Sequence, residues 1–336
     1  MSEQSCRYRS VAAAMVATVA MGCCVFAASP ALADDAAGGG VQPSPEVYLF
    51  SYFLGNGEDG LHLAWSEDGL TWSPLGGGRS FMTPTVGSKL VRDPCLCLGP
   101  DGAFHMVWTT GWGDRGFGIA HSTDLISWSE PSFVPVMADV PGAKNCWAPE
   151  IAWDTQSKQY VIYWSSTVEG RFPETAASGD EGWNHRIYRT VTRDFRNYAP
   201  PELFYEPGFN CIDAVIAPLG DRHVMVLKDE TRHPPAKNLR VSFAERMAGP
   251  WSPASPPFTP AGLWVEGPSI LRVGDAWHIY FDAYTQGRYG MMRTRDFREY
   301  EDLSDRVAFP KGARHGTALA IPRSLFDTIR TKLDGQ

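Results

Sequence analysis

Short apolar stretches alternate with polar turns along most of the chain. Examples are VYLFSYF at 47–53, AFHMVWTT at 103–110, QYVIYWSS at 159–166 and AWHIYFDA at 276–283. These stretches are rich in β-branched and aromatic residues, they are separated by glycine, proline and aspartate, and no long helical pattern appears before the C-terminus. The pattern predicts an all-β protein.

A turn phrase recurs at regular intervals. It reads SEDGLTWS from 66, STDLISWS from 122, TRDFRNY from 192 and TRDFREY from 294, with a degenerate copy, SFAERMAGPWS, from 242. The interval from Asp68 to Asp296 covers four repeats, which gives an average period of 57 residues. A four-stranded unit repeated five times at this period predicts a five-bladed β-propeller.

The aspartates of this phrase have a structural interpretation. An aspartate at such a position can accept hydrogen bonds from the backbone of its own turn, and the aromatic residue that follows can pack between blades. We therefore expect these carboxylates to stabilise turns at the end of the propeller that lies away from the start of each blade. They are Asp68, Asp124, Asp194 and Asp296.

A second set of acidic residues lies where the blades begin. The opening strands read VRDPCLCL from 91, NCWAPEIAW from 145, NCIDAVIAPL from 210 and WVEGPSILRV from 264. In antiparallel blades the starts of the innermost strands lie at one end of the barrel, next to its axis. This geometry brings three carboxylates, Asp93, Asp213 and Glu266, to one central pocket.

The fifth blade is expected to be split between the two ends of the repeat region. VYLFSYF, LHLAWS and TWSPL supply three strands, and ARHGTALAI at 313–321 supplies the innermost one. Such closure leaves no free sheet edge, and it places His315 at the ring position that Asp93 and Asp213 hold in other blades. The propeller is predicted to span 46–325, followed by a C-terminal tail at 326–336.

The N-terminal region predicts export. Arg7 and Arg9 precede an apolar run at 11–28, and the small residues Ala31 and Ala33 suit a signal-peptidase site. We expect a signal peptide at 1–33, a disordered linker at 34–45 and a secreted or periplasmic protein. A membrane anchor is disfavoured because the run is short, so no membrane association is expected after cleavage of the signal.

Composition narrows the partners further. The formal net charge is −8 and the basic residues are scattered, which disfavours nucleic acid and favours a neutral or cationic substrate. We expect a monomer. The cysteines beyond the signal peptide do not have the spacing of a zinc site, and we expect buried thiols, although an exported protein also allows disulfides. They are Cys95, Cys97, Cys146 and Cys211.

Three carboxylates in one pocket favour acid–base chemistry. Like charges and partial burial raise the pKa of at least one carboxyl group, which can protonate a leaving oxygen while a better solvated carboxylate activates water. That pairing performs glycoside hydrolysis. Trp112, Trp147 and Tyr284 suit the apolar faces of sugar rings, and Lys228 and Arg288 are candidate contacts on the same end of the propeller.

The motifs VRDP, CWAPE, IDA and VEGPSI occur in an order and spacing that resemble glycoside hydrolase family 43. This family of five-bladed propellers is typified by α-L-arabinofuranosidases and β-xylosidases, and the resemblance covers 46–325. It implies that Asp93 is the general base, that Asp213 tunes the pKa of the acid and orients it, and that Glu266 is the general acid. IDA departs from the commoner IDP form at Asp213.

The same resemblance assigns further residues. Glu266 stands beside Val265 and Ile270, so burial is expected to keep it protonated. WAPE and RHG assign Trp147 to a sugar platform and His315 to the pocket floor, where relatives can hold a water or a metal ion. No cofactor is required on this interpretation, no metal ligands are assigned, and a structural or pocket cation near His315 is left open.

Two other functions stay open. A retaining fructosidase-like propeller also carries RDP and a later glutamate, but its NDPNG motif has no counterpart in this sequence. A non-catalytic sugar-binding propeller would keep the aromatic residues, and the three carboxylates argue against it. The favoured interpretation is an inverting glycoside hydrolase. The insertion at 168–186 is placed to wall one side of the pocket, which favours release of terminal α-L-arabinofuranosyl or β-xylosyl residues.

Overall fold

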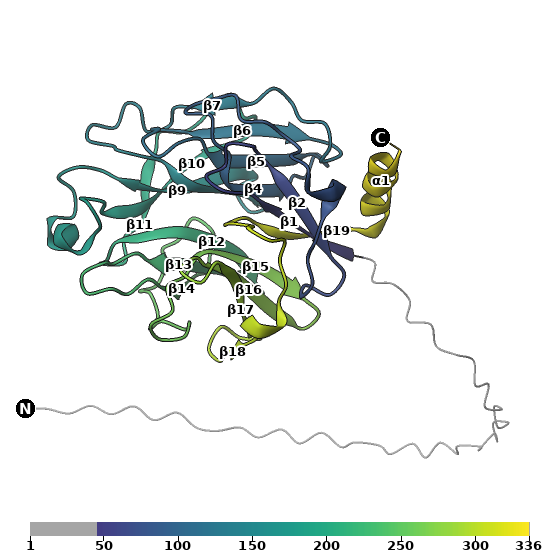
Figure 1. Cartoon of the computed structure of the whole chain (residues 1–336). Coiled ribbons are helices and arrows are strands. Elements are labelled where there is room, and N and C mark those ends of the chain that lie inside the picture. The colour runs from purple at the N-terminus through teal and green to yellow at the C-terminus, as the bar shows by residue number, and fades with distance from the viewer. Residues whose placement is uncertain (1–45, 336) are drawn as a thin grey trace, which may run out of the picture. The chain divides into compact units, whose positions relative to one another are not determined.

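The computed structural model describes residues 46–335, which form five antiparallel sheets (Figure 1). Blade 1 contains β4 (Arg92–Leu98), β5 (Phe104–Thr109), β6 (Phe117–Ser122) and β7 (Ser132–Val134). Blade 2 contains β8 (Trp147–Asp154), β9 (Gln159–Thr167), β10 (His185–Thr192) and β11 (Glu202–Tyr205). Blade 3 contains β12 (Cys211–Leu219), β13 (Arg222–Asp229) and β14 (Asn238–Ala244). Blade 4 contains β15 (Glu266–Val273), β16 (Ala276–Ala283), β17 (Arg288–Thr294) and β18 (Glu301–Asp302). Blade 5 contains β19 (Ala318–Pro322), β1 (Glu46–Tyr52), β2 (His62–Ser66) and β3 (Ser73–Pro74).

The five sheets form a closed ring, which confirms the predicted five-bladed β-propeller. The innermost strands contact one another in the order β4, β8, β12, β15 and β19, and β19 returns to β4. Five clusters of buried apolar side chains fill the five interfaces between neighbouring blades. Leu49 of blade 5 and Phe104 of blade 1, for example, share one cluster. The hydrophobic core therefore lies between blades, and the axis is left to polar side chains.

Blade 5 is closed by both ends of the repeat region, as predicted. β1 pairs antiparallel with β19, with Leu49 opposite Leu319, and Figure 1 shows the yellow β19 beside the purple β1. The preceding segment continues the contact, because Ser51 N–H donates to Thr317 O at 3.0 Å. Gly316 permits this approach: a Cβ there would lie 1.6 Å from Ser51 O.

Blade 3 has three strands in place of the expected four. The segment that follows β14 contains Pro250, Pro253, Pro256, Pro257 and Pro260. Proline has no N–H for a strand ladder. The segment still runs beside β14 through isolated backbone bonds, such as the one from Ser255 N–H to Val241 O at 2.8 Å.

The repeated turn phrase has the structural role predicted for it. In the first copy, Asp68 Oδ1 accepts hydrogen bonds from the N–H groups of Leu70 at 2.8 Å and Thr71 at 2.9 Å. Asp124, Asp194 and Asp296 accept the equivalent bonds in their own turns. Counted from the axis, these turns follow the third strand of blades 1, 2, 4 and 5, which are β6, β10, β17 and β2.

Four innermost strands begin with the same irregularity. The pairing register of β4, β8, β12 and β15 with the next strand shifts near its first residues. The residue inside each shift has a positive φ: 50° at Asp93, 44° at Ala148, 54° at Asp213 and 58° at Gly267. Such β-bulges re-aim side chains and are common beside active sites. Glu266 lies one position before the bulge of its strand, where Arg92, Trp147 and Ile212 lie in the other three.

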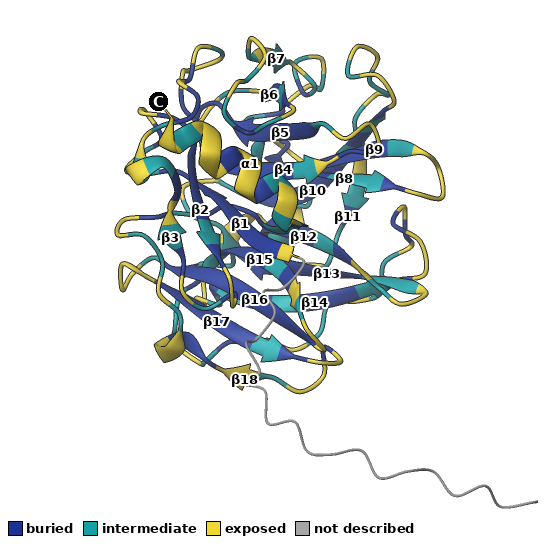
Figure 2. Ribbon diagram, turned by 90° about the vertical axis from the view of Figure 1, so that its right-hand side faces the viewer, coloured by how far each residue is buried: buried dark blue, intermediate teal, exposed yellow. Residues whose placement is uncertain are grey.

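The segment expected as a tail is a helix, so the predicted boundary at 325 falls inside an element. α1 spans Arg323–Asp334, and Phe326 and Ile329 are buried in the cluster shared by blades 5 and 1. Figure 2 shows α1 with an exposed outer face, and its inner side contacts β1 and β19. Lys332 also pairs with Asp124 at 3.0 Å. Among residues 46–335, no helix has the length and apolar character needed to cross a membrane.

Three short 3-10 helices complete the described elements, at η1 (Leu75–Gly78), η2 (Pro173–Ser178) and η3 (Ser304–Arg306). The four cysteines of this region are unpaired. Cys95, Cys146 and Cys211 are buried and Cys97 is partly buried, which agrees with the expected thiols.

Candidate active site

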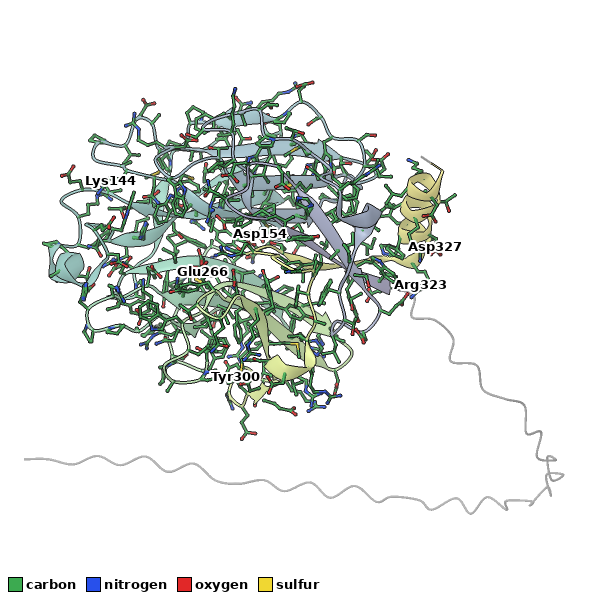
Figure 3. The ribbon with its side chains drawn as sticks, viewed as in Figure 1. Lys144, Asp154, Glu266, Tyr300, Arg323 and Asp327 are labelled. Carbon is green, nitrogen blue, oxygen red and sulfur yellow. The ribbon has the colours of Figure 1, made fainter. Side chains whose placement is uncertain are left out.

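A pocket of about 370 Å³ opens on the axis and takes its lining from all five blades. Its volume lies in the range of small-molecule sites. The pocket brings together six of the predicted site residues, Asp93, Trp112, Trp147, Asp213, Glu266 and His315. Gly55, Asn56, Arg92, Thr109, Ile212, Glu230 and Arg314 complete the lining. Figure 3 shows Glu266 in the interior of the ring and Arg323 and Asp327 on the helix outside it.

Asp93 is held as a carboxylate on one side of the pocket. Its Oδ1 lies 3.2 Å from His315 Nδ1, and Thr109 Oγ1–H donates to its Oδ2 at 2.8 Å. Burial alone would raise the pKa of Asp93, but the hydrogen bond and charge of His315, with the charge of Arg92, lower it to about 2. An ionised carboxylate of this kind suits a general base.

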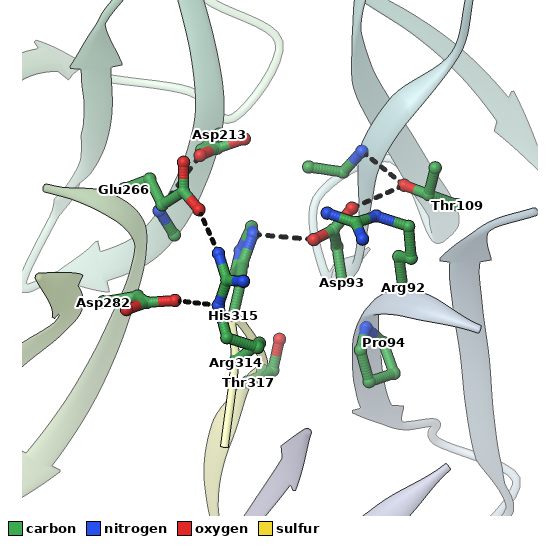
Figure 4. A network of polar contacts seen from close by, with 12 residues as sticks. Arg92, Asp93, Pro94, Thr109, Asp213, Glu266, Asp282, Arg314, His315 and Thr317 are labelled. Carbon is green, nitrogen blue, oxygen red and sulfur yellow. Dashed lines mark hydrogen bonds and ion pairs between the residues drawn. The ribbon is translucent and has the colours of Figure 1, made fainter. Parts of the chain in front are cut away.

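His315 forms the floor between Asp93 and the other two acids (Figure 4). Burial would lower its pKa, but the bond to Asp93 and the charges of Asp213, Asp93 and Glu150 raise it to about 9. Gly267 lies against the ring, since a Cβ there would approach His315 Cγ to 2.4 Å. The glycine of the EGP motif thus leaves room for the floor.

His315 pairs with Asp93, and no metal ligand set is assigned around it. Within 46–335, no group of three or more histidine, cysteine or carboxylate side chains has a metal-binding arrangement. The cation left open near His315 stays a prediction, and no step below depends on one.

Glu266 is ion-paired, contrary to the expectation that burial keeps it protonated. Lys228 Nζ lies 3.2 Å from its Oε2, and Arg314 Nη2 donates to its Oε1 at 2.9 Å. Burial would raise the pKa of Glu266, but the charges of Lys228 and Arg314 lower it. The carboxylate of Glu266 is therefore surrounded by basic side chains from blades 3 and 5. The apolar residues beside Glu266 in the sequence do not surround it.

Asp213 has the opposite shift and lies close to Glu266 (Figure 4). Burial raises its pKa to about 6, with the charges of Glu266 and Asp93 adding to the rise and those of His315 and Lys228 opposing it. The backbone N–H of Gly267, the residue after Glu266, donates to Asp213 Oδ2 at 3.0 Å. This bond fixes Asp213 against the strand that carries Glu266.

In four blades, one residue of the second strand links its blade to the next. This residue pairs across the sheet with the last residue of the innermost strand before the bulge. In blades 1 to 4 it is Thr109, Ser165, Lys228 and Asp282. Thr109 Oγ1 accepts from Ala148 N–H at 2.8 Å, and Ser165 Oγ accepts from Asp213 N–H at 3.1 Å. In blades 3 and 4 the position is charged, so Lys228 contacts Glu266 and Asp282 accepts from Arg314 Nε at 2.6 Å.

Aromatic side chains line the mouth over blades 1 and 2. Trp112 has 52% of its surface exposed, and its ring meets that of Trp147 edge-on at 5.5 Å. Trp147 Nε1–H donates to Trp112 O at 2.8 Å, and Trp183 packs behind Trp147 at 4.6 Å. The insertion at 168–186 contributes no residue to the pocket lining. It supports Trp147 from behind through Trp183.

The other predicted contacts divide into two groups. Lys228 and Tyr284 lie beside Glu266, with Lys228 Nζ 4.9 Å from the centre of the Tyr284 ring. Arg288 does not reach the pocket: its guanidinium bonds Gln286 at 2.9 Å and Asp305 at 3.2 Å on an exposed surface of blade 4. The side chain follows the local turn outward and is not part of the pocket lining, and the role of Arg288 as a substrate contact stays a prediction.

The sequence did not point to Arg314 and Glu230 as pocket residues, or to Glu150 as a buried carboxyl group with a raised pKa. Arg314 precedes His315 in the RHG motif, and Glu230 follows Lys228 by two residues, the spacing that places side chains on one side of a strand. Glu150 is buried in β8, where Cys95 Sγ donates to it at 3.1 Å and Thr317 Oγ1 at 3.3 Å. Burial raises the pKa of Glu150 to about 7.

Residues 44–327 match the protein family described as "Probable glycosyl hydrolase domain", a relative of glycoside hydrolase family 43. The chain belongs to this family. An alpha-L-arabinofuranosidase of Bifidobacterium longum subsp. longum is 23% identical over 314 residues, which cover 82% of this chain and 28% of that protein. The chain thus spans little more than a quarter of the length of this relative.

Two solved structures have a distant similarity to this chain. An α-L-arabinofuranosidase from Lactobacillus brevis is 16% identical with a TM-score of 0.49, covering 63% of this chain and 72% of its own. The catalytic domain of a family 62 α-L-arabinofuranosidase from Coprinopsis cinerea is 13% identical with a TM-score of 0.49, covering 68% of this chain and 76% of its own.

Proposed function

We propose that this protein is an inverting glycoside hydrolase that releases terminal α-L-arabinofuranosyl or β-xylosyl residues from plant oligosaccharides or polysaccharides. The observation that carries the proposal is the contrast between two sides of one pocket. Asp93 is held ionised by His315. Asp213 and Glu266 form a coupled acidic pair on the other side, in which the pKa of Asp213 is raised to about 6.

In the proposed reaction, Asp93 removes a proton from a water molecule, and the oxygen of that water attacks the anomeric carbon. Glu266 gives its proton to the departing glycosidic oxygen as the bond to the sugar breaks. Both products leave neutral, Asp93 returns its proton to solvent, and Glu266 takes up another. Each residue thus acts once per single displacement, which inverts the anomeric configuration.

Glu266 must gain a proton before it can act. In the free protein its carboxylate is stabilised by Lys228 and Arg314. A sugar that fills the pocket displaces water from the 23% of the Glu266 side chain that is exposed, and desolvation favours the protonated form of a carboxyl group. Asp213, next to it, adds a negative charge that acts in the same direction.

The substrate class is supported by the pocket and by family membership. A compact pocket with Trp112 and Trp147 at its mouth suits one terminal sugar ring stacked on an aromatic face. The Bifidobacterium longum relative is named an alpha-L-arabinofuranosidase. We further propose that the protein is exported and monomeric, which N-terminal sequencing of the secreted form and size-exclusion chromatography with light scattering would test.

The decisive experiment is hydrolysis of a panel of aryl glycosides followed by proton NMR of the first sugar released. Inversion at the anomeric carbon is expected with an arabinofuranoside or a xyloside. Retention of configuration would favour the fructosidase-like alternative. Binding of sugars without hydrolysis of any member of the panel would favour a non-catalytic propeller.

A further inference from the structure

A buried lysine joins the proposed acid to a second carboxylate of the pocket. Lys228 is 1% exposed, and its Nζ lies 3.2 Å from Glu266 Oε2 and 2.6 Å from Glu230 Oε2. Burial would lower the pKa of Lys228, but the charges of Glu230, Glu266 and Asp213 raise it. The ammonium group is therefore a fixed positive charge shared by two carboxylates.

Glu230 is held in place from its other side. Lys237 Nζ lies 2.5 Å from Glu230 Oε1, and Asp180 of the insertion at 168–186 lies 3.8 Å from the same nitrogen. Lys237 is 3% exposed, so this second cation is also withdrawn from water. Glu230 lines the pocket without a position in any of the blade-opening motifs.

Arg314, the other cation that contacts Glu266, is also shared between two carboxylates. Arg314 contacts Glu266 through Nη2 and Asp282 through Nε. The carboxylates of Glu266, Glu230 and Asp282 therefore share Lys228 and Arg314, and Lys237 is a third cation that pairs with Glu230. Glu266 faces both Lys228 and Arg314, and each of these two cations has another carboxylate to hold when Glu266 gives up its negative charge.

We infer that Glu230 is a positioning residue for the acid: by holding the Lys228 ammonium group, it sets how readily Glu266 takes up the proton that it delivers to the leaving group. The inference rests on the proposed function and extends it to a residue outside the three acids. Without the Glu230 carboxylate, Lys228 would have Glu266 as its main partner, and the ionised form of Glu266 would be favoured. Without Lys228, the protonated form would be favoured.

Other titratable groups face Glu266 and remain unchanged in such variants. They are Arg314 and His315 from the segment before β19, Asp213 from β12, Asp282 from β16 and Tyr284 from the loop after β16. They set the starting pKa of Glu266. The effect of Glu230 is thus a displacement of that pKa, which substitution of one residue can measure.

The test compares Glu230→Gln with Lys228→Met in the full chain. The alkaline limb of the pH profile of kcat/KM reports the pKa of the acid in the free enzyme. It should move to higher pH by about one unit or more in Lys228→Met, because an opposite charge in contact with a carboxylate lowers its pKa by about 1–3 units. It should move to lower pH, by a smaller amount, in Glu230→Gln, because Glu230 reaches Glu266 only through Lys228. Asp275→Asn, which removes an exposed carboxylate that pairs with Arg295, is the matched control and should leave the limb in place.

A second measurement does not depend on activity. Titration of protein labelled with carbon-13 at the glutamate carboxyl carbons, with the Glu266 signal identified by its loss in Glu266→Gln, reads the pKa directly by NMR. Opposite shifts in the two variants support the inference. Shifts in one direction, or no shift in Glu230→Gln, overturn it even if Lys228→Met fails to fold. If the wild type hydrolyses no glycoside, the proposed function fails, and the NMR titration still decides whether Glu230 controls Glu266.

Discussion

The carboxylate of Asp93 lies 3.2 Å from Nδ1 of His315, so blade 1 and the segment that closes blade 5 share one ion pair on the propeller axis. Each group shifts the pKa of the other. The pKa of Asp93 is lowered to about 2, and that of His315 is raised to about 9. The C-terminal segment that closes the ring therefore stabilises the ionised form of the candidate base against the cost of its burial.

This pair should make the free energy of unfolding depend on pH in two windows. The folded-state pKa of His315 is above its ordinary value of 6.5, so its contribution is complete below pH 6.5 and is lost as the pH rises through about 9. The pKa of Asp93 is below its ordinary value of 3.8, so its contribution is complete above pH 3.8 and is lost as the pH falls through about 2.

His315→Gln tests the alkaline window. Urea denaturation at a series of pH values should show that the decline in stability between about pH 6.5 and 9 becomes smaller in this variant. His233→Gln, at an exposed histidine, is the matched control. A decline of unchanged size in His315→Gln would mean that other groups cause it.

Glu266→Ala should lose activity mainly on substrates with poor leaving groups. An alkoxide needs the proton of the acid as it departs, whereas an activated phenolate leaves without it, so we expect a loss of about 100-fold or more on the former and much less on the latter. Steady-state kcat/KM for an alkyl glycoside and a dinitrophenyl glycoside of the same sugar gives the comparison. Glu299→Ala, at an exposed turn, is the control. Equal losses on both substrates would exclude Glu266 as the acid.

Asp68→Ala and Asp124→Ala should reduce stability and leave turnover nearly unchanged. Each carboxylate accepts two backbone hydrogen bonds in its turn, and losing them costs about 1–2 kcal/mol. Thermal unfolding and kcat measured on the same preparations separate the two effects. A fall in kcat of more than about 100-fold in a folded variant would place these turns at the active end of the propeller.

Much of the fold could be predicted because its signals are local. The turn phrase fixes its own backbone through Asp68 and its equivalents, and the inner strands of successive blades start with recognisable motifs. Ring closure then follows because the start of the repeat region supplies three strands of blade 5 and its end supplies the fourth. The helix α1 also has a local signal, since Phe326, Ile329 and Leu333 have helical spacing, but this stretch is short and near the end of the sequence, so its composition also fits a tail.

The charge state of the pocket could not be predicted, because it depends on contacts between blades. Glu266 has apolar neighbours along the chain, and only the ring brings Lys228 and Arg314 to its carboxylate. The same limit applies to Arg288: its place in a loop predicts a contact at the active end, whereas its side chain points to Asp305. A repeat predicts which strand ends lie together. The contacts that side chains make across the axis depend on the three-dimensional structure.

Gly267 lies between Glu266 and the rest of β15. Its φ is +58°, and a Cβ would lie 2.4 Å from His315 Cγ. Gly274 offers a matched control in the same blade, because its φ is +59° and a Cβ there would meet nothing within 4 Å. Both Gly→Ala substitutions incur the left-handed backbone cost of about 1–2 kcal/mol.

Gly267→Ala must also displace the His315 ring, on which the charge of Asp93 depends. We therefore expect Gly274→Ala to lower Tm modestly with normal kcat. Gly267→Ala should lower Tm further, reduce kcat by about tenfold or more, and move the acidic limb of the pH profile to higher pH as Asp93 loses its partner. Differential scanning calorimetry and the pH dependence of kcat/KM measure both. Equal effects of the two substitutions would mean that backbone strain alone matters at Gly267, and that the floor formed by His315 tolerates movement.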